Sequence, residues 1–375
     1  MKILIFNWQD IKNPLGGGAE VHLHQIFSRI AKKGHEVTLY CSSFKNAPGE
    51  EVIDGIKIIR EGGRYLFNYK VPIRYFLKFR KENYDIIIDD MNKIPFFTPL
   101  YIQKPLYLII HHLFGKSIFK EVPIPLAVYV YFMEKMGIHI YRRKKIPLFV
   151  VSESTRQEMK KYGFKDDLIS YAYNCVDHEV HHPNVASKNT APLIGYFGRL
   201  KKYKSIDHLI RAFALVVKIV PDAKLVIIGD GDFRISLEKL AKNLGILNSV
   251  HFTGYVSETE KVQWLNRAWF MVNTSLKEGW GLTVIESNAC GTTVIGSNVP
   301  GLRDAIKDGE TGLLYQYGNI KELSEKILLL INDEALRNRL SKNAVEWAST
   351  FNWDLVAEQV LSNIQKEIEQ GRGNN

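Results

Sequence analysis

The chain has 375 residues, of which 46% are hydrophobic and 24% charged, and its formal net charge is +10 at neutral pH. A single hydrophobic core rarely organises more than about 250–300 residues, so we expect two domains with the ligand site in a cleft between them. The three cysteines form no C-x-x-C pair, which excludes a disulfide framework and a thiolate zinc site.

The first residues form too short an apolar stretch for a signal peptide, and they predict a buried strand instead. No uninterrupted apolar run approaches the length of a membrane-spanning helix. Together with the sparse cysteines, this pattern predicts a cytoplasmic protein.

Apolar runs of strand length recur through the first half of the chain, and amphipathic segments separate several of them. One such segment covers residues 22–33 and ends at Gly34, a frequent residue just after a helix. The alternation predicts a parallel sheet with crossover helices, and hence an α/β domain over residues 1–183. The predicted strands are residues 3–7, 36–40, 85–89, 106–110 and 148–151.

A polar stretch rich in helix and strand breakers, residues 184–192, predicts a linker. A second series of strands follows it and predicts a second α/β domain over residues 192–354. The last helical pattern lies in the segment 355–375, which we expect to pack back on the first domain. The predicted strands of the second series are residues 193–197, 224–228, 249–252, 270–273 and 293–296.

The most informative stretch is residues 278–286, Glu-Gly-Trp-Gly-Leu-Thr-Val-Ile-Glu, which follows the predicted strand 270–273. We expect Glu278 in the loop and Glu286 about one turn into a helix, on the order of 10 Å apart at ~1.5 Å of rise per residue. Such carboxylates accept hydrogen bonds from sugar hydroxyls, while a helix N-terminus attracts phosphate. A strand-loop-helix joint with two solvated glutamates is the simpler alternative.

Two glycine turns follow predicted strands. Residues 16–20, Gly-Gly-Gly-Ala-Glu, open a helix and suit an anion at its N-terminus, although a flexible turn is an equal alternative. Gly198 and Arg199 follow the strand 193–197, with Lys204 five residues after Arg199. A guanidinium fork and a lysine charge suit a diphosphate, and solvated surface cations are the alternative.

A third turn contains a lone G-x-G, Gly229-Asp-Gly231, after the strand 224–228. The third glycine of a dinucleotide-binding fingerprint is absent, so a dehydrogenase is a poor interpretation. We predict a turn beside a nucleobase pocket.

His111 follows the strand 106–110 at the sheet edge where ligands gather in α/β proteins, with a structural histidine as the alternative. His22 and His24 are two residues apart on a helix and cannot share a face. Three further histidines, at 178, 181 and 182, have no carboxylate at a standard metal-ligand spacing. The sequence therefore predicts no metal site.

Basic and aromatic residues interleave in residues 60–82, and an apolar stretch within residues 122–145 leads to four consecutive cations. Both patterns indicate peripheral contact with a membrane, at its cytoplasmic face, or with a lipid phosphate. A surface helix with a buried aromatic face explains them as well. Nucleic acid is the weakest of the three interpretations, and we predict no nucleic-acid partner.

In this order the motifs resemble the family 4 retaining glycosyltransferases, which have the GT-B architecture of two facing Rossmann-like parallel-sheet domains with a cleft between them. The most specific match is the E-x7-E signature at residues 278–286. The other matching segments are residues 16–20, 151–155, 198–207, 229–231, 252–256, 289–291 and 299–301.

The resemblance implies a metal-independent hexosyltransferase with no cofactor, which takes its sugar from a UDP- or GDP-sugar. It places Arg199 and Lys204 at the leaving diphosphate, Glu278 at the donor sugar and His111 near the reacting centre. Glu286 would hold the ribose hydroxyls. The remaining donor-binding residues that it implies are Gly17, Gly18, Gly198, Val256, Gly279, Gly281, Leu282 and Thr283.

The acceptor implied is a carbohydrate or a lipid-linked molecule, such as a growing cell-surface glycan. A nucleotide-sugar epimerase of GT-B architecture and a non-catalytic nucleotide-sugar-binding module are the alternatives. Two residues depart from the family pattern, because Cys175 and Ser205 stand where glycine is usual. A cysteine at a position that requires a positive φ would be strained.

Overall fold

The computed structural model describes residues 1–63, 65–92, 94–120 and 122–373. The chain divides into two compact units, Met1–Asn174 with Trp353–Asn375 (unit 1) and Cys175–Asn352 (unit 2). The first change of unit falls before the polar stretch 184–192, which lies inside unit 2. Both units are α/β with mainly parallel sheets, so the predicted fold class is confirmed.

Unit 1 contains an eight-stranded sheet in the order β3-β4-β2-β1-β5-β6-β7-β8, with all neighbours parallel except the β3–β4 hairpin. Its central strands are buried on both faces, as expected where helices cover a parallel sheet. The strands are β1 Lys2–Phe6, β2 Glu36–Cys41, β3 Glu50–Ile53, β4 Ile56–Arg60, β5 Ile86–Asp90, β6 Leu106–Ile110, β7 Leu148–Val150 and β8 Ile169–Tyr171.

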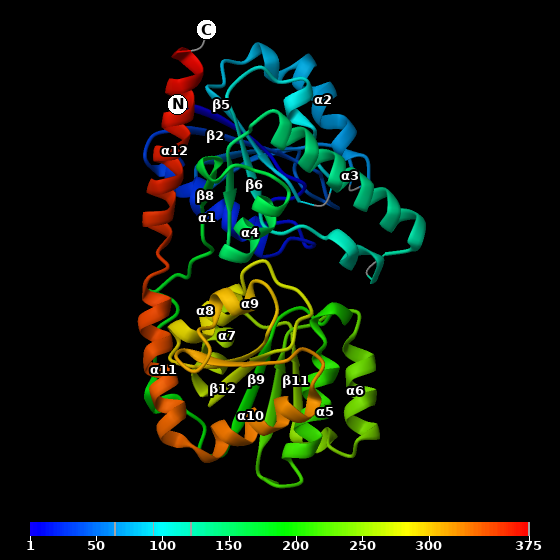
Figure 1. The fold of residues 1–375 in the computed structure, drawn as a ribbon, viewed down its shortest axis with the longest axis vertical. Coiled ribbons are helices and arrows are strands. Elements are labelled where there is room, and N and C mark those ends of the chain that lie inside the picture. Colours follow the sequence, from blue (N-terminus) through cyan, green and yellow to red (C-terminus); the bar gives the residue numbers. More distant parts are fainter. Residues whose placement is uncertain (64, 93, 121, 374–375) are drawn as a thin grey trace. The chain divides into compact units, whose positions relative to one another are not determined.

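The α-helices of unit 1 are α1 Gly18–Lys32, α2 Phe67–Leu77, α3 Ile124–Arg143, α4 Glu153–Lys161 and α12 Trp353–Gly373. The C-terminal helix α12 lies beside α1 in Figure 1. Two ion pairs join these helices, Arg29 with Asp354 at 2.7 Å and Lys33 with Glu358 at 2.6 Å.

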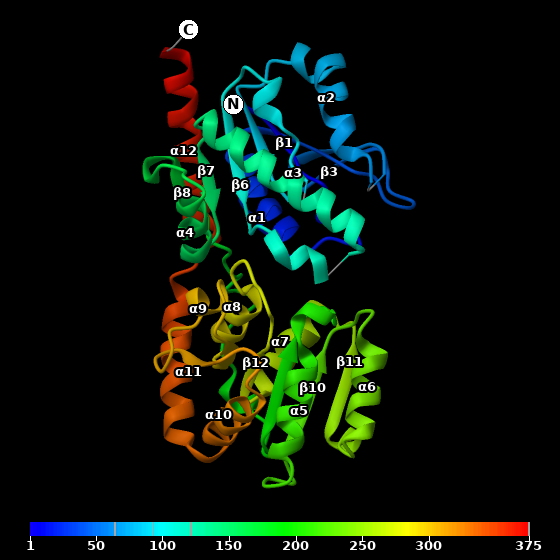
Figure 2. The ribbon, with the colours of Figure 1, turned by 45° about the vertical axis from the view of Figure 1, so that its right-hand side comes forward.

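Unit 2 contains a six-stranded, fully parallel sheet in the order β11-β10-β9-β12-β13-β14. Figure 2 shows part of this sheet, with β10, β11 and β12 labelled. The strands are β9 Leu193–Phe197, β10 Lys224–Ile228, β11 Val250–Gly254, β12 Phe270–Asn273, β13 Val294–Ser297 and β14 Gly312–Tyr315. The α-helices are α5 Ile206–Val216, α6 Arg234–Asn243, α7 Glu258–Arg267, α8 Leu282–Ala289, α9 Leu302–Ala305, α10 Ile320–Asn332 and α11 Glu334–Ser349.

The strand order of unit 2 is the 3-2-1-4-5-6 order of a Rossmann-like sheet, counted from β9 as the first strand. The order reverses between the neighbouring strands β9 and β12. In unit 1 the same reversal falls between β1 and β5. Ligands bind at such switch points in open α/β sheets, so the loops after these strands are candidate binding loops.

The basic segment 60–82 is partly a core element. Arg60 is 3% exposed, and its guanidinium donates to both carboxylate oxygens of Asp10, at 2.6 and 2.9 Å. Arg60 is therefore unavailable to a membrane, contrary to the surface role predicted for this segment. Its aromatic residues divide into a buried set, Phe67, Tyr75 and Phe79, and an exposed set, Tyr65, Tyr69 and Phe76. Arg64 lies outside the described residues.

Candidate functional site

The loops after β9 and β12 meet through a direct ion pair. Lys204 ends a 3₁₀ turn, Lys202–Lys204, and its Nζ lies 2.5 Å from Glu278 Oε1. Both side chains are only 15–16% exposed, so solvent screens the pair weakly. Burial is the largest influence and lowers the pKa of Lys204, but the charge and hydrogen bond of Glu278 together with Tyr203 outweigh it, so the net shift is upward. Two residues predicted for neighbouring parts of the donor, the diphosphate and the sugar, thus contact each other.

A polar network holds Glu278 in place. The Ser275 hydroxyl donates to Glu278 Oε1 at 2.7 Å, and the Ser275 backbone N–H donates to the Asn273 side chain at 3.1 Å. Thr274 lies between them, and its hydroxyl donates to the Lys204 carbonyl at 2.9 Å. The end of β12 therefore fixes both members of the ion pair.

The loop from Glu278 to α8 is packed through glycines. Gly281, at φ +88°, is the last residue before α8, which begins at Leu282, so Glu286 lies about one turn into the helix as predicted. Gly301 has φ +83°, and a Cβ on it would stand 2.3 Å from the Glu278 carbonyl oxygen. Only glycine allows this approach, so the loop preceding α9 supports the backbone of Glu278. Gly279 lies in the chain between Glu278, which Gly301 contacts, and Gly281.

Glu286 lies on α8, as expected, and is 9% exposed. Its Oε1 accepts a hydrogen bond from Lys261 Nζ at 2.9 Å. Its Oε2 is buried and has no hydrogen-bond partner among the described residues. A buried, unpartnered carboxylate oxygen is costly and therefore indicates a place for a ligand donor.

The structure brings two carboxylates to His181, although neither stands at a standard metal-ligand spacing in the sequence. One ligating atom from each of His181, Glu258 and Glu286 lies within 4.8 Å of the others, an arrangement that could hold a metal ion. Motif spacing missed it because the three residues come from separate parts of the chain. Lys261 Nζ lies within the same group, 2.6 Å from Glu258 Oε1.

The loop after β9 places the other predicted cation. Arg199 is exposed, and none of the ion pairs found within the described chain involves it. Its charge opposes the rise in the pKa of Lys204, so the two cations share one electrostatic environment. Gly198 packs so closely on the Gly229 turn that a Cβ at Gly229 would stand 2.2 Å from the Gly198 carbonyl oxygen. Val256 is half-buried just after β11.

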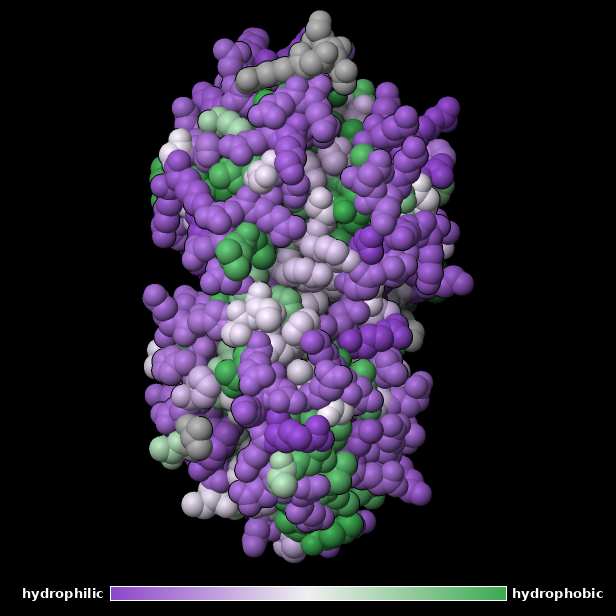
Figure 3. All heavy atoms as spheres, turned by 60° about the vertical axis from the view of Figure 1, so that its left-hand side comes forward, coloured by the Kyte–Doolittle hydropathy of each residue, from purple (hydrophilic) through white to green (hydrophobic). Residues whose placement is uncertain are grey.

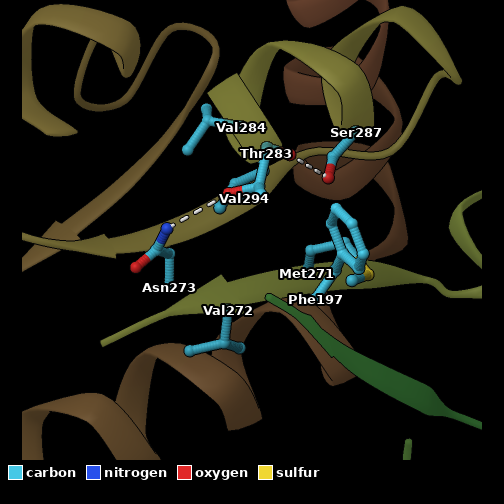
Figure 4. Close-up of a pocket in the computed structure, with 8 residues that line it drawn as sticks. All are labelled: Phe197, Met271, Val272, Asn273, Thr283, Val284, Ser287 and Val294. Atoms are coloured by element: carbon cyan, nitrogen blue, oxygen red, sulfur yellow. Dashed lines mark hydrogen bonds between the residues drawn. The ribbon is translucent and has the colours of Figure 1, made fainter. Parts of the chain in front are cut away.

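A small cavity lies between α8 and the sheet, and Figure 4 shows Thr283 and Ser287 of α8 above Asn273. Its volume is about 10 Å³, room for about one water molecule. A cavity of this size cannot admit a nucleotide. The lining residues are Phe197, Met271, Val272, Asn273, Thr283, Val284, Ser287 and Val294.

In unit 1, His111 follows β6 and faces the end of β5. Its Nε2 lies 3.2 Å from Asp90 Oδ1, and its ring packs edge-on against His22 with centroids 5.0 Å apart. Burial lowers the pKa of His111, but the charge of Asp90 and its hydrogen bond together raise the pKa by more, so the net shift is upward. Burial lowers the pKa of His22 to about 3, so this second imidazole is neutral.

The glycine loop of unit 1 begins α1, with Gly17 just before Gly18. The Gly17 N–H donates to Glu20 Oε2 at 2.7 Å. Burial raises the pKa of Glu20, whose other oxygen has no partner among the described residues. A carboxylate therefore takes up one of the backbone donors predicted to face a phosphate.

The two departures from the glycine pattern differ in their backbone. Cys175 is buried and is absent from the described residues with positive φ, so no strain arises there. Ser205 has φ +50° and ψ +40°, in the left-handed region, where a side chain costs energy. Its hydroxyl contacts the Tyr317 hydroxyl at 2.9 Å, which partly offsets that cost.

Two family models match the chain in tandem. The model described as Glycosyltransferase Family 4 matches residues 16–180, and the model described as Glycosyl transferases group 1 matches residues 177–347. The chain belongs to glycosyltransferase family 4. The family 4 signature residues, Glu278 and Glu286, therefore lie in the segment that carries the second model.

Curated relatives resemble this family 4 chain over part of their length. A D-inositol 3-phosphate glycosyltransferase of Thermomonospora curvata is 30% identical over 56% of this chain and 54% of its own. A poly(glycerol-phosphate) alpha-glucosyltransferase of Bacillus subtilis is 26% identical over 59% of this chain and 34% of its own. The chain thus spans about half the length, or less, of these relatives.

Solved structures extend the likeness of fold to nearly the whole chain. A sucrose-phosphate synthase of Thermosynechococcus elongatus superposes with a TM-score of 0.82 at 20% identity, over 97% of this chain and 98% of that one. HepE of Anabaena, solved with UDP and glucose, gives 0.76 at 18% identity, over 98% and 100%. These similarities confirm the GT-B fold for this family 4 member.

Within the described residues, no helix combines the length and the apolar composition required to cross a bilayer. The face of the molecule in Figure 3 is covered mainly by hydrophilic side chains.

Proposed function

We propose that this protein is a retaining, metal-independent glycosyltransferase that moves a hexose-type sugar from a UDP- or GDP-sugar to an acceptor. The observation that carries the proposal is the partly buried pair of Lys204 and Glu278, the second of which lies in the loop that leads into the N-terminus of α8. A cation and a helix N-terminus both favour the negative charge of a departing diphosphate. HepE, a structural neighbour, binds UDP-glucose, which supports this class of donor.

We assign the charged residues of unit 2 to separate parts of the donor. Lys204 and Arg199 would stabilise the diphosphate, Glu278 would accept from sugar hydroxyls, and Glu286 would accept from the ribose. We further propose that His111 contacts the donor sugar. In this mechanism the acceptor oxygen bonds to the anomeric carbon on the face from which the diphosphate leaves, and the acceptor proton passes to the departing phosphate oxygen.

A thermal-shift screen with UDP- and GDP-sugars tests the donor assignment, because a bound ligand raises the melting temperature. One nucleotide should shift the melting temperature, and the Glu286→Gln variant should lose most of that shift. No shift with any donor, at millimolar concentration, would contradict the proposal. Product analysis by NMR then checks retention of the anomeric configuration.

Experiments with the donor that binds distinguish the proposed transferase from a nucleotide-sugar epimerase and from a non-catalytic binding module. Incubation without an acceptor should leave the nucleotide sugar unchanged or slowly hydrolysed. An epimer in the mixture would identify an epimerase instead. Donor binding without turnover over a broad acceptor panel would indicate a binding module.

We propose a membrane-associated, lipid-linked acceptor on the basis of the exposed surface of α2 and α3. These helices contact each other through the Tyr69 and Tyr129 hydroxyls at 2.8 Å. Exposed apolar side chains gather on them, next to the exposed cations Lys70, Arg80 and Lys81. Large exposed apolar residues of this surface are Tyr65, Leu66, Tyr69, Ile73, Phe76, Leu77, Ile124, Leu126, Val128, Phe132 and Met136.

Sedimentation with anionic and with zwitterionic vesicles at low salt tests this surface. The protein should sediment with anionic vesicles, and Phe76→Asp should reduce the bound fraction. Ile235→Asp is the control, since Ile235 is 79% exposed on α6 of unit 2. Absence of sedimentation, or equal loss in both variants, would contradict a membrane role for α2 and α3.

A further inference from the structure

Lys261 is a buried lysine that no motif of the sequence marks. It lies on α7, is 5% exposed, and its ammonium group lies 5.2 Å from the centre of the Phe197 ring. Its Nζ is 2.9 Å from Glu286 Oε1 and 2.6 Å from Glu258 Oε1. A positive charge therefore lies between two carboxylates, one of which is the second glutamate of the signature.

The group around Lys261 has the donor set of a divalent-cation site. His181 Nε2 lies 3.3 Å from Glu258 Oε1 and 4.0 Å from Glu286 Oε1. An ionised carboxylate in a buried place is strongly destabilised unless a cation is paired with it. Lys261 already contributes that charge through two short contacts, so the chain carries its own cation where a metal would otherwise bind.

The contact uses only one oxygen of Glu286. Oε1 accepts from Lys261, while Oε2 is buried without a hydrogen-bond partner among the described residues. A carboxylate held at one oxygen has restricted rotation, and its second oxygen then points in one direction. A neutral ligand with hydroxyl donors satisfies such an oxygen without adding charge, and a ribose has two of them.

We infer that Lys261 is a positioning residue for the nucleotide: it holds Glu286 through Oε1 and thereby presents Oε2 to a ribose hydroxyl. The inference rests on the proposed function and adds a residue that contacts Glu286 and not the ligand. Glu286 Oε2 held in this way would favour ribonucleotides over their deoxy counterparts, because only a ribose hydroxyl donates the hydrogen bond to it.

Calorimetry on the full chain tests the inference with UDP, GDP and their 2′-deoxy and 3′-deoxy forms. A hydrogen bond to a charged group contributes about 1.5–3 kcal/mol, which corresponds to roughly a 10- to 150-fold difference in Kd. We expect the wild type to prefer the ribonucleotide by about that factor for at least one hydroxyl. Lys261→Met should reduce the preference to about threefold or less, and Lys261→Arg should retain part of it.

Arg267→Met is the matched control, since Arg267 is exposed in the last turn of the same helix. It should leave the preference unchanged. If Lys261→Met fails to fold, the double variant Lys261→Met with Glu258→Gln removes one charge of each sign and carries the same expectation.

Four other outcomes would overturn the inference. A Lys261→Met variant with lower thermal stability but an unchanged ribose preference would make Lys261 merely structural and overturn the inference. A wild type that binds nucleotides without any ribose preference would overturn it too, while leaving the proposed function in place. No binding of UDP or GDP would overturn both. Stabilisation of the wild type by Mn²⁺ alone, lost in Glu286→Gln, would assign the group to a metal instead.

Discussion

Lys204 and Glu278 neutralise each other across the loops that follow β9 and β12, with Nζ and Oε1 2.5 Å apart. A diphosphate that binds at Lys204 must therefore share the ammonium group with Glu278. On the proposed function, such sharing would keep the lysine oriented and charged before a donor binds, so less reorganisation would be needed during transfer.

Replacing Lys204 should remove most turnover without unfolding the protein. Lys204→Met removes the charge that we propose stabilises the departing diphosphate, and we expect kcat to fall about 100- to 1,000-fold, as for the loss of one preorganised electrostatic contact. Lys202→Met is the control, because Lys202 is exposed in the same 3₁₀ turn. Steady-state kinetics with a matching melting curve measures both. Wild-type turnover in Lys204→Met would rule out its assignment to the diphosphate.

The close approach of Gly301 to the Glu278 carbonyl should make this glycine irreplaceable. Gly301→Ala combines a positive φ with a Cβ 2.3 Å from a backbone oxygen, so we expect a loss of more than about 2 kcal/mol in unfolding free energy. Gly318→Ala is the control, since Gly318 has φ +86° with open space around its Cβ. Urea denaturation measures the difference. Equal losses in the two variants would show that the contact is unimportant.

The left-handed backbone of Ser205 predicts an order of stability among its variants. Ser205→Gly relieves about 1–2 kcal/mol of strain but loses the contact with Tyr317, so it should lie within about 1 kcal/mol of the wild type. Ser205→Ala loses the contact and keeps the strain, and should be about 1–2 kcal/mol less stable than wild type. Chemical denaturation of the three proteins checks this order, and an alanine variant more stable than the glycine variant would refute it.

The pair of His111 and Asp90 should make stability depend on pH. The pKa of His111 is raised in the folded state. Protonated His111 therefore stabilises the fold fully at a pH below its pKa in the unfolded chain, about 6.5. That contribution is lost as the pH rises through the folded-state pKa. The difference in melting temperature between wild type and Asp90→Asn should therefore be larger at pH 6 than at pH 8.5. A difference independent of pH would argue against the pair.

Apolar runs between glycine turns were sufficient to predict the central strands. β6 and β12 coincide with the predicted residues 106–110 and 270–273, since both are buried on two faces and are apolar throughout except at Asn273. The β3–β4 hairpin was missed, because Glu50 and Glu51 make the edge strand polar. The Asp54-Gly55 turn between the strands was the available signal.

Motif spacing located Lys204, Glu278 and Glu286, but it did not predict their partners. Lys261 on α7 and His181 in the segment before β9 approach Glu286 on α8 through tertiary contacts, which no local pattern encodes. The strain attributed to Cys175 belongs instead to Ser205, since both replace glycine but only the second has a positive φ.

Helix α12 completes unit 1, although it is the last helix to be synthesised. Unit 1 is built from both ends of the chain, whereas unit 2 is one continuous segment between them. On the ribosome, unit 2 is complete before residues 353–373 emerge, and until then the partners of Arg29 and Lys33 on α1 are missing. The unit that begins first therefore finishes last, and a chain that has reached residue 352 still lacks the helix that packs on α1.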